Sequence, residues 1–220
     1  MWFMKYYPVN LDIRQKECLV TGGGEVAARK VKTLLKCGAC VTVVSPDVTK
    51  TLNDLWQESA IILKKRRFAD RDLNGIFLVV AATDNNLLNC KIAAMAKEQN
   101  LLCNVADSPK DSSFILPAVV DRGDLIIAIS TSGESPALAK KLRKELENKF
   151  GEEYVVLLQL LGSIRRKLLK KSHDPKTHKK LFSTALDKGL VEMIREKERD
   201  DIDLLLEELF GSEYKLDKLR

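Results

Sequence analysis

The sequence predicts an α/β protein with a parallel sheet in its first half, followed by a small strand and helix segment and a helical C-terminal domain. Three observations lead to this fold class. Strand and helix patterns alternate from Cys18 to about Asp107, the strands in that stretch are almost continuously apolar, and helical patterns fill the chain from Gly151 onward. Apolar strands that alternate with helices are typical of a parallel sheet covered on both faces.

The first strand, the first helix and the second strand lie within residues 18–45. CLVTG is apolar and predicts the first strand. The segment 26–36 is predicted to be helical because Val31, Leu34 and Leu35 recur at helical spacing. VTVVS then predicts the second strand.

Three further strands and two helices follow up to residue 107. We expect a short helix over residues 52–58, a third strand at IILKKR and a buried strand at FLVVAA. Asp84 or an adjacent Asn caps the next helix, which runs through Lys97. LLCNVA is the fifth strand and completes the predicted sheet.

The pattern changes after Asp107. FILPAVV and LIIAIST are two strand-like runs joined by the turn sequence DRGD. The TSGESP loop leads into the helix ALAKKLRKELENKF, with Ser135 as its cap and Pro136 in its first turn. One apolar stripe on that helix predicts a protein core or a dimer interface, and it consists of Leu138, Leu142, Leu146 and Phe150.

From residue 151 onward the patterns are helical. The helical stretches are EEYVVLLQLLGSIRRKLLKK, HKKLFSTALDKGLVEMIREK and DIDLLLEELFG, and SHDPKTH marks a loop. His173 and His178 lie in that loop at a spacing that does not suit two ligands on one helix face, so we expect no metal site. We predict a nucleotide-binding domain over residues 1–113, a connector over 114–150 and a helical domain over 151–220.

The composition is that of a globular protein. Apolar residues make up 45% of the 220, and no apolar run approaches the ~20 residues of a membrane span. The five cysteines are an odd number, and we interpret Cys37 and Cys40 as small core residues, so a disulfide framework is not expected. The N-terminal MWFMKYYPVN lacks the features of a leader peptide. We therefore expect a cytoplasmic protein with no membrane partner.

A glycine-rich turn joins the first predicted strand to the first helix, and it reads Gly22-x-Gly24-x-x-Ala27. Gly22 permits a tight turn, Gly24 lets the backbone approach a pyrophosphate, and Ala27 allows close packing of the helix on the strand. Glu25 and Val26 offer free N–H groups to the phosphates at the helix start. In this strand-turn-helix frame the motif predicts a Rossmann-like dinucleotide site, with a turn that binds no ligand as the alternative.

The second predicted strand ends in Ser45, where a carboxylate that binds the ribose hydroxyls is usual. Asp47 comes slightly late for that role, and Ser45 offers only a weaker hydrogen bond. No Lys or Arg follows the strand directly to favour a 2′-phosphate. The motif therefore favours NAD over NADP, and we expect Pro46 and Asp47 to border the adenosine.

Three long segments carry a specific combination of motifs. They are YYPVNLDIRQKECLVTGGGEVAARKVKTLL, VVAATDN and CNVADSPKDSSFILPAVVDRGDLIIAISTSGESPALAKKLR. Together they resemble the precorrin-2 dehydrogenase family, which is the NAD-dependent dehydrogenase and ferrochelatase module of siroheme synthase. The resemblance covers residues 4–150 closely and the helical tail loosely.

The resemblance implies oxidation of precorrin-2 to sirohydrochlorin with NAD⁺ and, in some members, insertion of Fe²⁺ to give siroheme. It also implies a homodimer in which the connector is a dimerisation segment that forms much of the interface. Members of the family usually lack the acid at the end of the second strand too, which accounts for Ser45. No methyltransferase domain follows the module in this sequence, so we expect a stand-alone form.

Asp107 is the candidate catalytic residue. It follows the fifth strand at the carboxyl edge of the predicted sheet, where open α/β sheets bind ligands, and it matches the family's aspartate in the NVxDxP motif. A carboxylate there suits the proton transfer that accompanies hydride transfer. The alternative is a turn-capping Asp before Pro109. Thr83 and Asp84 follow the fourth strand and are expected to flank the cofactor, with helix capping as the alternative.

The predicted substrate residues come from two regions of the chain. We expect a tetrapyrrole cleft, with ordinary loop roles as the alternative, to be lined by Asn104, Ser113, Ser130, Thr131 and Ser132. Precorrin-2 is rich in carboxylates, so a basic rim is also expected. IRRKLLKKSHDPKTHKK offers that rim, or else a solvated helix face.

Three other functions compete with this one. A regulatory NAD-binding module shares the glycine turn but does not need the CNVADSPKDSSF segment, and it stays as the alternative. A nucleic-acid-binding protein would use the basic tail, but the net charge is only +6, aromatic residues make up 6%, and the basic run contains none. We therefore expect no nucleic-acid partner. The intact glycine turn argues against an enzyme that only inserts metal and has lost NAD binding.

Overall fold

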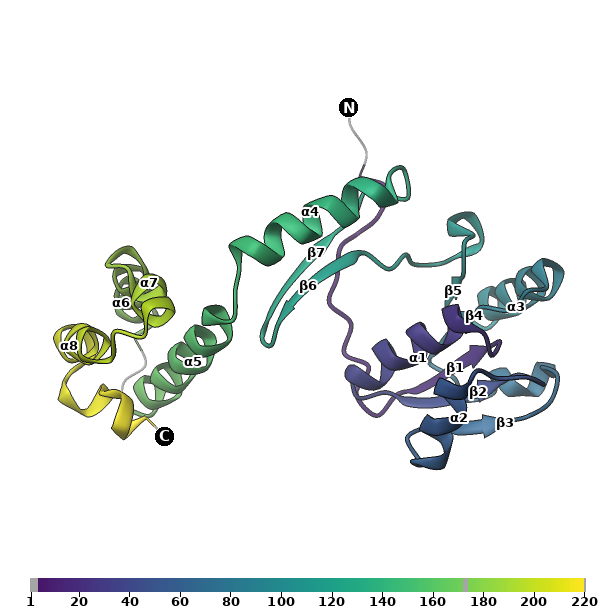
Figure 1. Cartoon of the computed structure of the whole chain (residues 1–220), viewed down its shortest axis with the longest axis horizontal. Helices are drawn as coiled ribbons and strands as arrows, with labels where there is room; N and C mark the ends of the chain where they lie inside the picture. The colour runs from purple at the N-terminus through teal and green to yellow at the C-terminus, as the bar shows by residue number, and fades with distance from the viewer. Residues whose placement is uncertain (1–3, 172–173, 220) are drawn as a thin grey trace. The chain divides into compact units, whose positions relative to one another are not determined.

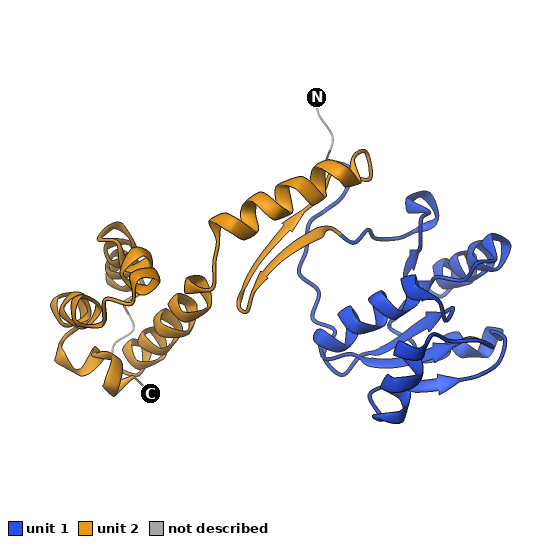
Figure 2. Cartoon of the chain, viewed as in Figure 1, with its two compact units in different colours: residues 1–116 blue, residues 117–220 orange. Residues whose placement is uncertain are grey.

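This computed structural model describes residues 4–171 and 174–219 and divides the chain into two compact units. The first unit comprises residues 1–116 and the second residues 117–220 (Figure 2). The hairpin, its helix and the helical tail all belong to the second unit. The finer division into three parts at residues 113 and 150 stays a prediction.

The first unit is built on a five-stranded parallel sheet with the strand order β3-β2-β1-β4-β5 (Figure 1). Thr21 aligns with Val44 and with Ala81, so the carboxyl ends of the three central strands are level. The strands are β1 (Glu17–Thr21), β2 (Cys40–Val44), β3 (Ile62–Lys64), β4 (Leu78–Ala81) and β5 (Leu102–Val105). The predicted parallel sheet is confirmed.

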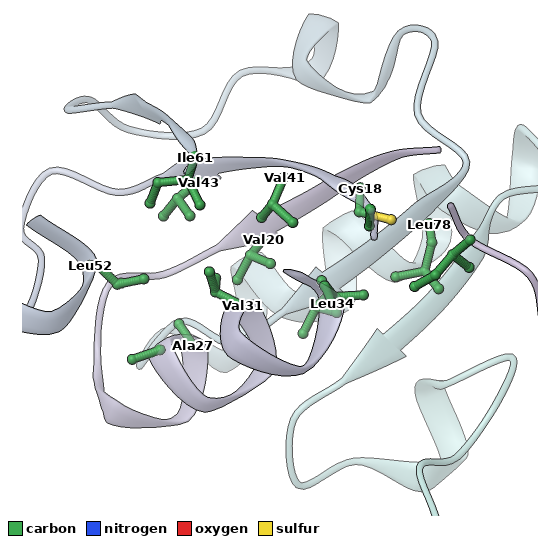
Figure 3. Packing of buried hydrophobic residues seen from close by; sticks show 14 residues of the cluster. Cys18, Val20, Ala27, Val31, Leu34, Val41, Val43, Leu52, Ile61 and Leu78 are labelled. Carbon is green, nitrogen blue, oxygen red and sulfur yellow. The ribbon is translucent and has the colours of Figure 1, made fainter. Parts of the chain in front are cut away.

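Helices cover both faces of this sheet. α1 (Glu25–Lys36) and α2 (Lys50–Gln57) pack on one face, where Val31 meets Val20 and Val43 in one buried cluster (Figure 3). α3 (Asn86–Glu98) packs on the other face. Two 3₁₀ turns, at Asp70–Leu73 and Pro109–Asp111, follow β3 and β5. The α/β class is confirmed, and the helix ends differ from the expected ones by one or two residues.

A buried carboxylate fixes the segment between β3 and β4. The side chain of Asp72 is 1% exposed, and Arg66 donates hydrogen bonds of 2.7 and 2.5 Å to its two oxygens. The backbone N–H of Ala69 donates a third bond of 3.0 Å. The Arg66 guanidinium is the main cause that lowers the pKa of Asp72 to about 2.

Replacing Asp72 with Asn should lower the free energy of unfolding at pH 7 by about 2 kcal/mol. The folded-state pKa lies below the unfolded one, so this stability is present above about pH 4 and is lost as the pH falls towards 2. Urea titrations of both proteins across that range would measure it. Asp12→Asn is the control, because the exposed Asp12–Arg14 pair is screened by water. A difference between wild type and Asp72→Asn that is independent of pH would contradict the linkage.

The second unit begins with a two-stranded antiparallel hairpin, β6 (Ala118–Arg122) and β7 (Leu125–Ile129). α4 (Pro136–Lys149) follows, and the Ser135 hydroxyl accepts a 3.2 Å bond from the Leu138 N–H, which confirms the predicted cap. Arg122 donates to the carbonyls of Glu147 and Phe150 at the C-terminal end of α4. These bonds satisfy orphan carbonyls and hold the helix on the hairpin.

The helical tail has a core of its own. Leu157, Leu160 and Ile164 of the first tail helix meet Leu190 and Leu206 in a buried cluster. Within the part of the tail that the structure describes, the α-helices are α5 (Glu153–Lys171), α6 (Pro175–Asp187), α7 (Leu190–Glu196) and α8 (Arg199–Phe210). Two 3₁₀ turns, Ser212–Tyr214 and Leu216–Lys218, follow α8. The predicted helical C-terminal region is confirmed.

Three sequence-based expectations differ from the structure. Cys37 and Cys40 are exposed and are not core residues, because they lie at the end of α1 and the start of β2. His178 is buried in α6, since Asp174 caps a helix that begins inside the expected loop, whereas His173 lies outside the described residues. The apolar stripe of α4 is covered only in part within the chain, because Leu138 is 47% exposed whereas Leu142, Leu146 and Phe150 are half-buried, and its alternative role in a dimer interface stays a prediction.

Candidate active site

The glycine turn between β1 and α1 is held tightly by the ends of the neighbouring strands. Gly22 has a φ of +107°, and a Cβ atom there would lie 2.2 Å from the Ala82 carbonyl oxygen. A Cβ atom at Gly23 would lie 1.9 Å from the Asp47 carbonyl oxygen. The Gly22 N–H also donates a 3.0 Å bond to Val44. The shape of the turn is therefore set by β2 and β4, and side chains are excluded from its first two positions.

Gly24 and the start of α1 form an open cradle. A Cβ atom at Gly24 would meet no protein atom within 4 Å. Gly24 is the N-cap of α1, so no side chain caps the helix, and the first N–H bonded back to the cap is that of Ala28. The preceding N–H groups, which include those of Glu25 and Val26, are available to an anion. This cradle fits the pyrophosphate of a dinucleotide.

A hydrogen bond between two neighbouring residues shapes the turn directly after β2. Ser45 is buried, and its hydroxyl donates a 2.6 Å bond to the carbonyl of Asp47. That hydroxyl shapes the turn that covers Gly23 and is not free for a ribose. Pro46 and the Asp47 side chain are exposed beside the glycine turn, and their contact with the adenosine stays a prediction.

The loop after β4 depends on a residue that sequence reasoning missed. Asn89 is 3% exposed, and its side-chain oxygen accepts bonds from the Thr83 N–H (3.2 Å) and hydroxyl (2.7 Å). Its amide group donates to the Thr83 carbonyl. One sequence signal could have indicated this residue. Asn89 lies at helical spacing from Ile92 and Ala96, so it is a polar residue on the buried face of α3. Asn89 thus holds Thr83 at the carboxyl edge of the sheet.

Asp84 is exposed in the same loop. It does not cap α3, because Asn85 performs that role and accepts a 3.0 Å bond from the Leu88 N–H. The adjacent Asn of the prediction is therefore the cap. The Asp84 side chain remains at the edge where a ligand would lie.

Asp107 lies in the turn directly after β5. Pairing with β4 ends at Ala106, and Asp107 follows with a left-handed φ of 60°, which Asp and Asn adopt more readily than most residues. Its side chain is exposed and makes no hydrogen bond within the described residues. The carboxylate therefore does not cap the turn, which removes the structural alternative for this residue. It is free to exchange a proton with a ligand at this edge.

The segment after this turn folds back along β5. The hydroxyls of Ser112 and Ser113 accept bonds of 2.9 and 2.8 Å from the N–H groups of Val105 and Cys103. The Asn104 amide donates a 3.1 Å bond to the carbonyl of Phe114. Asn104 and Ser113 thus have structural bonds, and their role in substrate binding stays a prediction.

The predicted residues of the first unit lie at one edge of the sheet. The strand order reverses between β1 and β4, which is where open α/β sheets bind ligands. From the loops at this edge come Gly22, Gly24, Glu25, Val26, Pro46, Asp47, Thr83, Asp84 and Asp107. An open helix N-terminus, the exposed loops after β2 and β4 and a carboxylate without a hydrogen bond therefore lie at the same edge of the sheet.

Two family models match the chain. A putative NAD(P)-binding family covers residues 9–118, and the central part of the sirohaem biosynthesis protein covers residues 122–149. The chain belongs to the NAD(P)-binding family of siroheme synthases. The first model spans the whole parallel sheet and includes the glycine turn, and the role of the cradle at Gly24 in binding the cofactor stays a prediction.

Relatives of this siroheme synthase family match by sequence and by structure. A siroheme synthase of Vesicomyosocius okutanii is 41% identical over 74% of this chain and 35% of its own length. Siroheme synthase 2 of Yersinia enterocolitica is 35% identical over 95% of this chain and 44% of its own length. The chain thus spans less than half of these curated relatives. The solved structure of SirC, precorrin-2 dehydrogenase, has a TM-score of 0.76 at 29% identity and covers 93% of this chain and 98% of SirC.

The second family model contains the remaining predicted residues. Ser130, Thr131 and Ser132 lie in the loop between β7 and α4 of the second unit. Two of their hydroxyls form hydrogen bonds within the loop. The Ser130 hydroxyl accepts a bond from the Ser132 N–H, and the Thr131 hydroxyl accepts one from the Ser135 N–H. Their place in the substrate cleft stays a prediction.

Neither a metal-ligand cluster nor a membrane-spanning helix is found in the described part of this family member. Residues 4–171 and 174–219 hold no group of three or more His, Cys, Asp or Glu side chains arranged for a metal ion. No helix in that part of the chain has the length and apolar content needed to cross a bilayer.

Proposed function

We propose that this chain oxidises precorrin-2 to sirohydrochlorin with NAD⁺ as the hydride acceptor. The observation that carries the proposal is the match to SirC, a protein named as precorrin-2 dehydrogenase, over 98% of its length. The named siroheme synthases support the same biosynthetic context. The open cradle at Gly24 supports a dinucleotide-dependent reaction.

The residues at the sheet edge have distinct roles in this reaction. NAD⁺, when bound, supplies the hydride acceptor. The N–H groups of Glu25 and Val26 bind its pyrophosphate, Pro46 and Asp47 border the adenosine, and Thr83 helps to place the cofactor. Asp84 flanks the cofactor beside Thr83.

Asp107 performs the proton transfer. Precorrin-2 loses two hydrogens in the oxidation: a hydride leaves one carbon for NAD⁺, and a proton leaves a neighbouring site. The free carboxylate of Asp107 accepts that proton and returns it to water, so charge and electrons balance. Asn104, Ser113, Ser130, Thr131 and Ser132 are proposed to contact the macrocycle.

The residues after β2 favour NAD⁺ over NADP⁺, because no Lys or Arg directly follows that strand to meet a 2′-phosphate. Of the cations that end the neighbouring strand β3, Lys64 and Arg66 pair with Asp72. This pairing supports the preference for NAD⁺.

An anaerobic assay of the purified chain with precorrin-2 and NAD⁺ tests the proposal. NADH absorbance and the sirohydrochlorin spectrum should appear together, against a control without enzyme. A parallel arm with sirohydrochlorin and Fe²⁺ or Co²⁺ measures metal insertion as a further activity. NAD⁺ binding without NADH formation would contradict the dehydrogenase and support the regulatory module instead.

We also propose a homodimer and a cytoplasmic location. Val119 and Ile126 lie on the outer face of the hairpin and are 40% and 53% exposed, whereas Val120 on the inner face is buried. This face also carries Ala128 and, opposite Ile126, Asp121, and its exposed apolar residues suit a second copy of the chain. All five cysteines are free, and burial raises the pKa of Cys18 and Cys103 to about 11, which suits a reducing compartment.

Ile126→Asp should weaken the dimer at least about tenfold, because a carboxylate would be desolvated on the apolar face. Sedimentation equilibrium over a concentration series would measure the dissociation constant. Leu204→Asp is the control, since Leu204 is 64% exposed on α8, away from the hairpin. Equal dissociation constants for the two variants would contradict an interface at the hairpin.

A further inference from the structure

Lys30 is a partly buried lysine of α1 without a direct partner. Within the described part of the chain it makes neither a hydrogen bond nor an ion pair. Lysine is rarely buried unless it is paired, because removing an ammonium from water is costly. Its ammonium is therefore partly desolvated and available to an anion.

Lys30 lies in the second turn of α1, on a flank of the helix beside its buried stripe. Val31 and Leu34 of α1 share one buried cluster with Leu102 of β5 and with Phe114. Side chains alternate along a strand, so Asn104 lies on the same face as Leu102 and towards α1. α1 begins at the glycine turn, at the carboxyl edge of the sheet, so Lys30 in its second turn lies close to the edge at which β5 ends.

The charge neighbours of Lys30 point to the same place. Burial and the like charge of Arg29 lower the pKa of Lys30, while the carboxylate of Asp107 acts in the opposite direction. Asp107 is thus close enough to influence Lys30 but does not pair with it. Both groups belong to elements that meet the carboxyl edge of the sheet, and neither has a hydrogen bond or an ion pair within the described residues.

We propose that Lys30 binds a carboxylate of the tetrapyrrole and thereby positions the macrocycle against Asp107. The inference rests on the proposed function, which supplies an acidic macrocycle as substrate. The pyrophosphate of the cofactor is not its partner, because the first-turn N–H groups of α1 serve that anion and Lys30 lies in the second turn. A charge-assisted hydrogen bond to a substrate carboxylate would also offset the desolvation of the partly buried Lys30 ammonium.

The test compares Lys30→Met, Lys30→Arg and the control Lys32→Met with the wild type. Lys32 is exposed on the same helix, so its variant removes the same charge without reaching the site. The readouts are KM and kcat for precorrin-2 oxidation, the Kd of sirohydrochlorin by absorbance titration, the Kd of NAD⁺ by calorimetry, and the melting temperature. Lys30→Gln gives a second uncharged variant if the Met variant folds poorly.

Lys30→Met should raise KM for precorrin-2 and the Kd of sirohydrochlorin by about tenfold to a hundredfold and leave the Kd of NAD⁺ unchanged. Lys30→Arg should retain most of the affinity, and Lys32→Met should resemble the wild type. Loss of NAD⁺ affinity with unchanged tetrapyrrole affinity would overturn the inference, as would equal tetrapyrrole affinity in all four proteins. If the wild type binds sirohydrochlorin but does not oxidise precorrin-2, the proposed dehydrogenase function is wrong. The sirohydrochlorin titrations of the variants would then still test whether Lys30 binds the tetrapyrrole. A wild type that binds no tetrapyrrole overturns both.

Discussion

Asp107→Asn should lower kcat for precorrin-2 oxidation by at least about a hundredfold and leave the affinity for NAD⁺ unchanged. Asn keeps the shape of the side chain and tolerates the left-handed φ of 60°, so the turn after β5 is preserved. What is lost is the ability of the group to accept a proton. Anaerobic steady-state kinetics would measure kcat, and calorimetry would measure the Kd of NAD⁺.

Asp84→Asn is the matched control for this variant. Asp84 is an exposed carboxylate at the same edge of the sheet and is proposed to flank the cofactor, so its loss changes the local charge equally and acts on the affinity for NAD⁺, not on the proton transfer that kcat measures at saturating NAD⁺. The control should keep kcat within a few-fold of the wild type. An Asp107→Asn variant with wild-type kcat would show that the proton leaves by another route.

Substitutions at the two glycines of the turn should separate cofactor binding from folding. Gly24→Asp should weaken NAD⁺ binding more than about a hundredfold, because a carboxylate in the cradle repels the pyrophosphate and its oxygen caps the N–H groups. The free energy of unfolding should stay the same or rise, since Asp is a good N-cap and a Cβ atom at Gly24 meets open space. Calorimetry and urea titration would test the two statements.

Gly22→Ala should instead lower the free energy of unfolding by more than about 2 kcal/mol. The new Cβ atom would lie 2.2 Å from a backbone carbonyl oxygen, which cannot give way without moving β4. Gly75→Ala is the control, because Gly75 has a positive φ of 75° but nothing near its Cβ position, so it should cost only about 1 kcal/mol. If both variants lose the same free energy of unfolding, the cost at Gly22 comes from its positive φ and not from a clash of the new Cβ atom.

The sequence was sufficient for the sheet and for the location of the site. Strands such as FLVVAA are apolar on both sides and are bounded by turns, so their type and order follow from local patterns. The carboxyl ends of parallel strands meet at one edge, which places Gly24, Thr83 and Asp107 together once the strands are known. These features depend on residues close together in the chain.

The details that could not be predicted depend on contacts between distant or unlike groups. The Ser45 hydroxyl is taken by a carbonyl two residues on, and Asn89 reaches back to Thr83, but neither choice of partner is visible in a pattern of apolar residues. The stripe that contains Leu138 shows that a helix has an apolar face without showing what covers it. Cys37 was misplaced because residue type alone suggested burial.

The serine hydroxyls beside β5 have a consequence for how copies of the chain can meet. β5 is the last strand of its sheet, and its outward N–H groups at Cys103 and Val105 would otherwise offer a template for a strand from another molecule. Ser113 and Ser112 already occupy both donors. The opposite border, β3, is only three residues long and ends in a lysine. Both borders of the sheet are thus poor sites for edge-to-edge aggregation, which leaves association to surfaces outside the sheet.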